Sequence, residues 1–555
     1  MASTIAPSWI LRALTFRERR QCVQTSDGLR PPEGIRRLQL YRHWFTRGGR
    51  DPDGWPRFLA ENQTSDADLL KVLGSDRSIV LPKWTVTLSE LVDELQRRKS
   101  PFKQGHNAAE NIALPVATYA WRHLRDKGHV DLDSFASQEA TSALQRALTS
   151  RFARLNSHLI KDLVPSDGPC VHATGAGRPK TSPTVTCELV ALQLLQTYPG
   201  LGRLWAVNVE NWSRFIRDFV VHAKTFSKSQ GISKKARYVI ETIDPDLSDF
   251  HHKGRTVMRV RFANGKDWFY KPRSTTLELQ WFALLRWLNR AGFETPFKVI
   301  RVICRKDHSW MQAVAPRQCE SRTEVTMYYR RAGAMLYLLY LLRGVDVHAG
   351  NIIAAGADPV VIDCESLLHP TIRISKEATQ AEEGSILRTG MLPMSRGSSQ
   401  SQNTSALGRK VLGSHSVRLK DQQMQAADFV DSIIAGFCDM DAFIRPRAAR
   451  FQRALGRFRS HSCRHIYRPT MSYGSIMNQS LSPALLRDGF DRSLFLLAFC
   501  RDGLVPKRIV RSDLVALERG DIPIAHGRVS RPLQLPTKRV INEMLTQIRQ
   551  ALANN

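Results

Sequence analysis

The sequence predicts an α+β fold in which a short strand-rich segment lies between mainly helical regions. Three observations predict it. Apolar residues recur at helical spacing over residues 187–226. Residues 256–271 are rich in β-formers and turn at Asn264-Gly265, a strong hairpin signal. A long helical pattern then covers residues 323–343 and stops at Gly344.

Length and charge set broad limits on the class of protein. A chain of 555 residues predicts two to four structural units, and an apolar content of 42% is that of an ordinary globular protein. The formal net charge of +30 favours anionic partners: nucleic acid, acidic membrane, acidic peptide or phosphorylated substrate. Charge alone does not choose among these, and a solvated basic surface is the plain alternative.

The cysteines and apolar runs exclude several other classes. Nine cysteines are present, with no C-x-x-C pair and no neighbouring histidine, which argues against a zinc site. Their odd number and scattered positions suit a reducing cytosol, so we expect a cytoplasmic protein. The N-terminus does not have the pattern of a signal peptide. The longest apolar run, residues 332–342, is too short to cross a bilayer.

The middle of the chain has the order of elements found in kinases. A hairpin delivers Lys271 at the end of its second strand. The elements that follow are a helix at 277–289, strands at 298–304 and 310–314, a helix at 323–343, a polar loop at 346–351 and a buried strand at 359–362. Asp363 ends that last strand. This order predicts a phosphotransfer site.

Four residues in this order suit phosphotransfer. Asp346 can orient or deprotonate an attacking hydroxyl, and Asn351, five residues later on the same loop, can hold Mg²⁺. The Asp363 carboxylate can bridge Mg²⁺ to the β- and γ-phosphates of ATP, while the Lys271 ammonium neutralises phosphate charge. Each residue alone has an ordinary structural explanation, so the prediction depends on their joint order.

A polar segment precedes the first strand, where a kinase places the loop that covers the phosphates. It runs from Asp249 through His251 and Gly254 to Arg255 and lacks a glycine-rich signature. We expect backbone amides around Gly254, together with side chains, to cover the phosphates instead. The alternative is a polar turn without such a role.

Taken together, these motifs resemble the dehydratase domain of class II lanthipeptide synthetases, the LanM type. The stretches that carry the resemblance are 249–257, 270–274, 328–333, 346–351, 363–365, 387–393, 464–473 and 520–523. They span about residues 187–555, two thirds of the chain, and the ordered run is more specific than any one motif.

The resemblance implies a lipid-kinase-like bilobal core with large helical elaborations at both ends. We expect a mainly helical region over residues 1–186, with a Pro/Gly/Ser-rich linker near 165–186, and a dehydratase domain over 187–555. Within that domain the N-lobe covers about 240–315 and the C-lobe about 320–555. The Gly175-Ala176-Gly177 sequence in the linker is a weak phosphate motif, because no strand precedes it. The Ser- and Gln-rich stretch 394–408 is predicted to be a mobile loop.

The resemblance also assigns site residues. It places these in the phosphorylation site: Lys271, Asp346, His348, Asn351, Asp363 and Glu365. Asp249 and His251 line the same cleft, and Arg464 and Thr470 match positions tied to phosphate elimination. Two residues depart from the family pattern: Cys364 stands where a larger aliphatic residue is common, and Asp513 where Glu is expected.

The implied activity uses ATP and Mg²⁺ to phosphorylate Ser and Thr of a ribosomal precursor peptide with a leader. Elimination of the phosphate would give dehydroalanine and dehydrobutyrine. That step requires a base, for which His348 and His251 are the candidates, and a cation on the departing phosphate. Arg464 offers a planar, permanently charged fork, with Arg468 as a weaker candidate.

Partners follow from the same resemblance. Full-length synthetases carry a zinc cyclase domain with a Cys-His pair; this sequence has no such pair, so we expect no ring closure by this chain. A separate cyclase and an export transporter are candidate partners. Residues 1–186 are a candidate leader-binding region, although no motif there shows it. Neither a nucleic-acid partner nor a membrane span is expected.

Two other functions compete with this one. A kinase-like phosphotransferase without elimination would leave a stable phosphate on its product. A non-catalytic peptide-binding remnant would not bind Mg-ATP. A nucleic-acid-binding protein is a distant third, and salt-dependent binding of DNA or RNA would favour it.

Overall fold

The computed structural model describes most of the chain and divides it into two compact units. The described residues are 8–22, 32–74, 81–103, 105–128, 130–160, 186–232, 238–370, 385–393, 404–409, 415–458, 461–501, 505–528 and 534–553. The predicted linker, apart from Thr186, and most of the loop predicted at 394–408 lie outside these ranges. The first unit comprises Met1–Lys266 and Arg468–Pro523, and the second comprises Asp267–Tyr467 and Ile524–Asn555. Each unit is therefore built from two separate stretches of sequence.

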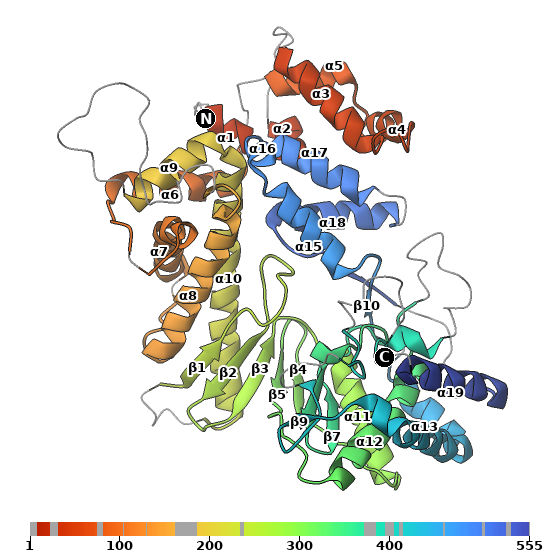
Figure 1. Cartoon of the computed structure of the whole chain (residues 1–555). Coiled ribbons are helices and arrows are strands. Elements are labelled where there is room, and N and C mark those ends of the chain that lie inside the picture. Colours follow the sequence, from red (N-terminus) through yellow and green to blue (C-terminus); the bar gives the residue numbers. More distant parts are fainter. Residues whose placement is uncertain are drawn as a thin grey trace. The chain divides into compact units, whose positions relative to one another are not determined.

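The first unit is mainly helical. Its elements are α1 (Ser8–Arg12), α2 (Phe16–Cys22), α3 (Pro32–Phe45), α4 (Gly54–Glu61), α5 (Asp66–Gly74), α6 (Trp84–Arg97), α7 (Ala108–Gly128), α8 (Gln138–Asn156), α9 (Cys187–Thr197), α10 (Pro199–Ser229), β1 (Ile240–Asp244), β2 (Met258–Phe262), α15 (Thr470–Ser480), α16 (Pro483–Leu486), α17 (Gly489–Cys500) and α18 (Lys507–Arg519). The long helix α10 contacts α6, α7, α8 and α9 (Figure 1). Pro199 occupies its first position, where a missing N–H costs nothing.

A shared aromatic core joins the two stretches of the first unit. Phe16 on α2 and Phe490 on α17 pack edge to face, with ring centroids 5.4 Å apart. Tyr41 on α3 contacts the same Phe490 ring at 6.0 Å. A buried ion pair between Arg19 and Asp488, 3.0 Å long, reinforces this contact. The N-terminal helices therefore need α17 to bury their apolar faces.

The second unit carries most of the predicted site. Its elements are β3 (Asp267–Lys271), α11 (Thr276–Arg290), β4 (Val302–Cys304), β5 (Ser309–Gln312), α12 (Arg322–Leu341), η2 (Ala349–Asn351), β6 (Ile352–Ala355), β7 (Asp358–Val361), η4 (Ile386–Thr389), β8 (Arg418–Leu419), β9 (Gln422–Gln423), η7 (Ala426–Phe429), α13 (Val430–Ile444), η8 (Arg445–Arg447), α14 (Ala448–Gly456), β10 (Cys463–His465), β11 (Ala525–Gly527) and α19 (Lys538–Ala553). Strand β5 pairs antiparallel with β3 on one side and with β4 on the other.

The local elements agree well with the sequence predictions. Helices predicted at 277–289 and 323–343 are confirmed as α11 and α12, and the strands around Asn264-Gly265 as β2 and β3. The strand predicted at 298–304 is shorter: only Val302–Cys304 pair, because the partner β5 is itself four residues long. The chain is mixed helix and sheet, as an α+β fold requires, whereas the lipid-kinase-like bilobal core stays a prediction. None of the described helices has the length and apolarity needed to cross a membrane.

Two glycines let helices α12 and α13 pack with their backbones in contact. A Cβ atom on Gly333 would lie 1.9 Å from the Ile433 carbonyl oxygen. One on Gly436 would lie 1.7 Å from the Arg330 carbonyl oxygen. Neither neighbour is a side chain that could rotate away. Gly333 lies in the stretch 328–333, one of those that carry the resemblance stated above, and its role in the structure is helix packing.

We predict that Gly436→Ala destabilises the second unit by about 1–3 kcal/mol or more, because the methyl group would overlap a backbone carbonyl. Thermal unfolding measures the effect as a lowered Tm. Gly456→Ala on α14 is the control, since a Cβ there meets no atom within 4 Å. Equal Tm values for the two variants would contradict the packing explanation.

Candidate active site

The register of one hairpin brings Asn351 and Asp363 together. Strands β6 and β7 are antiparallel, with Ile352 opposite Val361. The next residues outward are Asn351 and Ile362, and the Ile362 amide donates to the Asn351 carbonyl at 2.9 Å. Asp363 follows directly. Residues that are twelve apart in sequence therefore end on neighbouring strands at the same edge, as the order of elements predicted.

Asp346 is held in an unusual backbone conformation. Its φ of 64° lies in the left-handed region, which L-residues seldom adopt. Two contacts fix it: the Asn351 side-chain amide donates to the Asp346 carbonyl at 2.8 Å, and the Val347 amide donates to the Thr389 carbonyl at 2.9 Å. The Asp346 side chain keeps 38% of its surface exposed, so its carboxylate is accessible to solvent.

The predicted motif at 387–393 supports this loop. Gly390 has a φ of 80°, and a Cβ there would lie 3.1 Å from the Val347 amide nitrogen. Glycine therefore allows both the turn and the close approach. On the other side of the loop, the Ala349 amide donates to the Thr404 carbonyl at 2.9 Å. The loop that bears Asp346 is thus bonded to segments on two sides.

Lys271 is buried, unlike the solvent-facing lysine that a following proline would ordinarily suggest. It ends β3 with 6% of its surface exposed, and its ammonium donates to the Ile362 carbonyl at 2.8 Å. Its Nζ lies 3.5 Å from Asp363 Oδ2 and 3.6 Å from Glu278 Oε1. The lysine thus joins β3 to both α11 and the end of β7.

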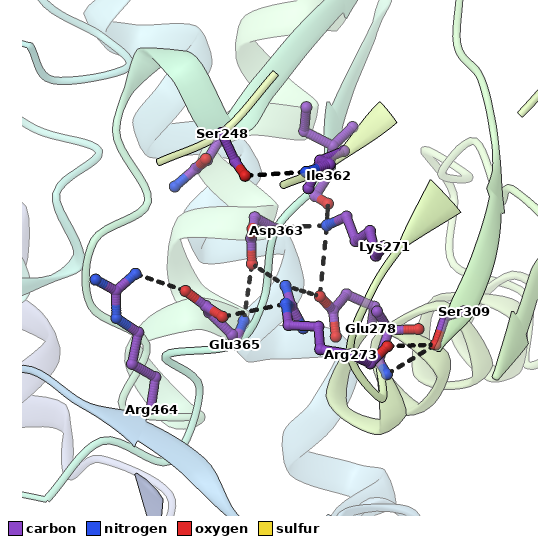
Figure 2. Close-up of polar contacts among 12 residues, drawn as sticks. Ser248, Lys271, Arg273, Glu278, Ser309, Ile362, Asp363, Glu365 and Arg464 are labelled. Atoms are coloured by element: carbon purple, nitrogen blue, oxygen red, sulfur yellow. Dashed lines mark hydrogen bonds and ion pairs between the residues drawn. The ribbon is translucent and has the colours of Figure 1, made fainter. Parts of the chain in front are cut away.

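Sequence reasoning missed two residues of this cluster, Glu278 and Arg273. Figure 2 shows the Arg273 guanidinium among three carboxylates. Its partners are Glu278 Oε1 at 2.7 Å, Asp363 Oδ1 at 3.0 Å and Glu365 Oε2 at 3.2 Å. Glu278 is fully buried on α11, and its Oε2 atom has no hydrogen-bond partner among the described residues. A Lys on a strand paired with a Glu on the following helix is also the arrangement of kinase sites.

Glu365 extends the network to Arg464. The Arg464 side chain donates to Glu365 Oε1 at 2.6 Å, and its backbone amide donates to the Glu365 carbonyl at 2.7 Å. His369, further along the same segment, accepts a bond at Nε2 from the Ile466 amide at 2.9 Å. Strand β10 therefore lies along residues 365–369, which places the predicted elimination arginine beside the predicted phosphorylation residues.

The charges in this cluster divide the carboxylates into two kinds. Burial opposes ionisation of Asp363, but the charges of Lys271 and Arg273 outweigh it and hold its pKa well below the ordinary value. Glu365 also has a lowered pKa, because Arg273 and Arg464 outweigh its burial. Asp346 has a raised pKa, due first to burial. Asp363 is thus suited to bind a cation, and Asp346 to accept a proton.

The residues fit a Mg²⁺-nucleotide. Mg²⁺ prefers oxygen ligands, and it usually binds one or two carboxylates together with substrate phosphates. Asp363 is ionised and 28% exposed, and its Oδ2 makes only the 3.5 Å contact with Lys271 within the described residues. Asn351 adds an amide oxygen on the adjoining strand end. Lys271 and Arg273 supply positive charge for phosphate groups.

Comparison with known proteins places this site in a family. The model of a family described as a domain of unknown function, DUF4135, matches residues 198–416 and 412–526, more than half of the chain. The chain belongs to the DUF4135 family. It is also similar to a lacticin 481/lactococcin biosynthesis protein of Lactococcus lactis subsp. lactis, with 23% identity over 197 residues. That match covers 33% of this chain and 21% of the relative's length.

The DUF4135 match also includes two motifs that bind each other in the first unit. His252, Lys253 and Gly254 all have positive φ values, from 47° to 74°. The amides of Lys253 and Gly254 donate to the Asp521 carboxylate at 2.7 and 2.8 Å. The prediction that amides around Gly254 cover the phosphates is therefore wrong for these two, because Asp521 already occupies them. Asp521 of the 520–523 motif thus closes this turn.

The same contact fixes His251, while Asp249 stays exposed. The His251 Nδ1 donates to the Ile522 carbonyl at 2.8 Å, and the Ile522 amide donates to the Phe250 carbonyl at 2.8 Å. Because a carbonyl can only accept, the neutral His251 ring carries its proton on Nδ1. Asp249, His251 and Thr470 belong to the first unit, whereas the remaining predicted site residues belong to the second.

The structure places four further positions of the DUF4135 region that the sequence singled out. Arg468 is buried and donates to Asp513 at 3.3 Å and to the Cys500 carbonyl at 2.9 Å, so it is bound within the core of the first unit and is not suited to phosphate. Asp513 also accepts a hydrogen bond from the Tyr473 hydroxyl at 2.7 Å, which explains a carboxylate at this position.

Thr470 is the first residue of α15, after the N-cap Pro469. Cys364 is buried in the core of the second unit.

We predict that His369 makes the second unit sensitive to acid. Burial, aided by the charge of Arg388, lowers its pKa to about 4, against about 6.5 in an unfolded chain. Between pH 6.5 and pH 4 the ring binds a proton in the unfolded chain but not in the folded one. The free energy of unfolding therefore falls as the pH drops below about 6.5, and it levels off below about 4. The loss between pH 7.5 and pH 5 is about 2 kcal/mol. Urea unfolding at these two pH values measures it.

The variant His369→Gln keeps an acceptor for the Ile466 amide but does not titrate. Its stability is expected to change less between the two pH values than that of the wild type. His461→Gln, at a half-buried histidine of the same unit, controls for the loss of a histidine. Equal pH dependence in wild type and His369→Gln would exclude His369 as the source.

Proposed function

We propose that this chain phosphorylates Ser and Thr hydroxyls of a precursor peptide with ATP and then eliminates the phosphate. The products would be dehydroalanine and dehydrobutyrine. The observation that carries the proposal is the cluster in which Lys271 meets Glu278 and Asp363. The similarity to a lacticin 481/lactococcin biosynthesis protein supports a role in lanthipeptide modification. The resemblance of the ordered motifs to LanM dehydratases points to dehydration within that role.

In the first step, Asp346 would position the substrate hydroxyl and accept its proton. A pKa raised by burial favours that role, because a carboxylate that binds protons more readily is a better base. Asp363 and Asn351 would hold Mg²⁺, and Lys271 would neutralise phosphate charge. Bound MgATP would supply the phosphoryl group. The contribution of the protein would be positioning and charge stabilisation.

In the second step, a base removes the α-proton of the phosphorylated residue, and the bond between the β-carbon and oxygen breaks. The electron pair leaves with the phosphate. Arg464 is the proposed cation for the phosphate, because it lies beside Glu365 and its charge acts on Asp346. One site would then serve both steps, and the phosphorylated residue would not need to leave between them.

The hydrogen bonds give the two candidate bases different tautomers. His348 Nδ1 accepts from the Gly350 amide at 3.1 Å, so the neutral ring carries its proton on Nε2. His251 has the opposite tautomer, with Nδ1 donating to the Ile522 carbonyl. Both His348 and His251 remain candidates for the base of the elimination step, as the sequence predicts.

We predict that two variants separate the two steps. The test incubates the chain with a Ser-containing precursor peptide, ATP and Mg²⁺ and follows the peptide by mass spectrometry. The wild type should give net loss of water. Lys271→Ala should give neither product, whereas Arg464→Ala should accumulate phosphopeptide, because it removes the proposed cation for the leaving group.

The outcomes decide among the candidate functions. Stable phosphopeptide from the wild type would favour a kinase without elimination. Normal dehydration by Arg464→Ala would overturn the role given to that arginine. Absence of MgATP binding would support a non-catalytic peptide-binding protein.

We predict that Glu278→Gln lowers the rate of phosphorylation about 100-fold, because Lys271 and Arg273 lose the carboxylate that orients them. ADP release in the presence of peptide measures it, and kcat should fall more than KM changes. Glu294→Gln is the matched control, since Glu294 in the same unit is 84% exposed. If both variants keep wild-type kcat, Glu278 does not position Lys271.

A further inference from the structure

A basic groove lies in the second unit, separate from the cluster around Lys271. Helices α11 and α14 border it, and its volume is about 330 Å³. Trp287 and Leu284 of α11 contribute an apolar wall. Arg450, Arg453 and Arg457 line the opposite side. Nothing in the proposed phosphorylation or elimination step uses these residues.

These three arginines lie on the solvent-facing side of α14 and at its C-terminal end. They are three and four positions apart, the spacing at which side chains share a helix face. The other face of α14 is apolar and buried, through Phe451 and Leu455. The three arginines are exposed, so the amphipathic packing of α14 presents them to solvent beside Trp287.

The positive charge of the groove is not balanced. No acidic side chain pairs with Arg450, Arg453 or Arg457 within the described part of the chain, whereas many other arginines of this unit are paired with Asp or Glu. The sequence explains why, because residues 442–487 contain neither Asp nor Glu. Three unbalanced charges beside an aromatic side chain form a surface suited to an anionic partner.

The distance between the arginines indicates what size of anion the groove can bind. Steps of three and four residues rise by about 4.5 and 6 Å along a helix, about 10 Å in all. A single phosphate or carboxylate group is too small to reach all three. Side chains on one face of an extended peptide recur about every 6.6–7 Å, somewhat more than these steps, and the long arginine side chains can span the difference. Trp287 can pack against an apolar side chain between the acidic ones.

We propose that this groove docks an extended, acidic segment of the peptide substrate. The proposal rests on the proposed function, since it takes the substrate to be a peptide. Docking there would involve α11, the helix whose Glu278 faces Lys271. It would also raise the effective concentration of the Ser and Thr residues near the site, without a contact to the reacting atoms.

A charge-matched pair of variants tests the docking. The groove variant is Arg450→Gln/Arg453→Gln/Arg457→Gln. The control, Lys298→Gln/Lys306→Gln/Arg539→Gln, removes the same charge from exposed positions of the same unit outside the groove. Fluorescence anisotropy with a labelled oligo-glutamate peptide should show binding about tenfold weaker for the groove variant, and nearly unchanged for the control.

Three outcomes would overturn the proposal. One is an equal loss of binding in both variants, which would show a general charge effect. Another is no loss in the groove variant. The third is a single-stranded oligonucleotide of equal charge that binds more tightly than the peptide and depends on the groove, which would make the partner a nucleic acid.

A second measurement separates this proposal from the proposed function. A Ser-containing peptide with a Glu-rich segment is compared with one whose Glu residues are replaced by Gln, and modification is followed by mass. If groove-dependent binding of oligo-glutamate occurs but neither peptide is modified, the proposed function is wrong and the docking proposal stands. If the wild type and both triple variants modify the Glu-rich peptide at equal rates, the docking proposal is wrong and the proposed function stands.

Discussion

One guanidinium group holds the candidate active site together. Arg273 bonds to Glu278 on α11 and to both Asp363 and Glu365 after β7, so with Lys271 it ties the end of β3 to α11 and to the segment after β7. Three carboxylates this close would repel one another without a cation among them. Removing one member of such a buried group costs several kcal/mol, because the remaining charges lose their partners. The placement of Lys271 and, through Glu365, of Arg464 therefore depends on this arginine.

The sequence predicts the parts of this site that lie at the ends of elements. Local sequence signals mark the start or the end of a strand at three site residues: Lys271, Asn351 and Asp363. The positions of these residues in the fold could therefore be predicted from the order of the strands. Glu278 gave no such signal, because a charged residue near the start of an amphipathic helix is ordinary. Its burial depends on how α11 is rotated against β3. Asp521, 267 residues from Gly254, could not be paired by any local pattern.

The two proposed steps have unequal support. The arrangement of Lys271, Asp346 and Asp363 makes chemical sense for phosphotransfer without reference to any family. Elimination depends more on resemblance, to which the structure adds the contact of Arg464 with Glu365. The loop around Asp346 is held in a strained conformation by Thr389 and Gly390, which is how a fold fixes a reactive side chain before substrate arrives.

The division of each unit into two stretches has a consequence for synthesis of the chain. The N-terminal helices bury Phe16 and Tyr41 against Phe490, and Asp521 closes the turn at Gly254. A ribosome adding about 5–20 residues each second needs roughly 10–50 seconds to pass from residue 266 to residue 523. During that time the apolar surface that α2 and α3 bury against α17 lacks this partner, so the nascent chain would be a client for chaperones that bind exposed hydrophobic segments.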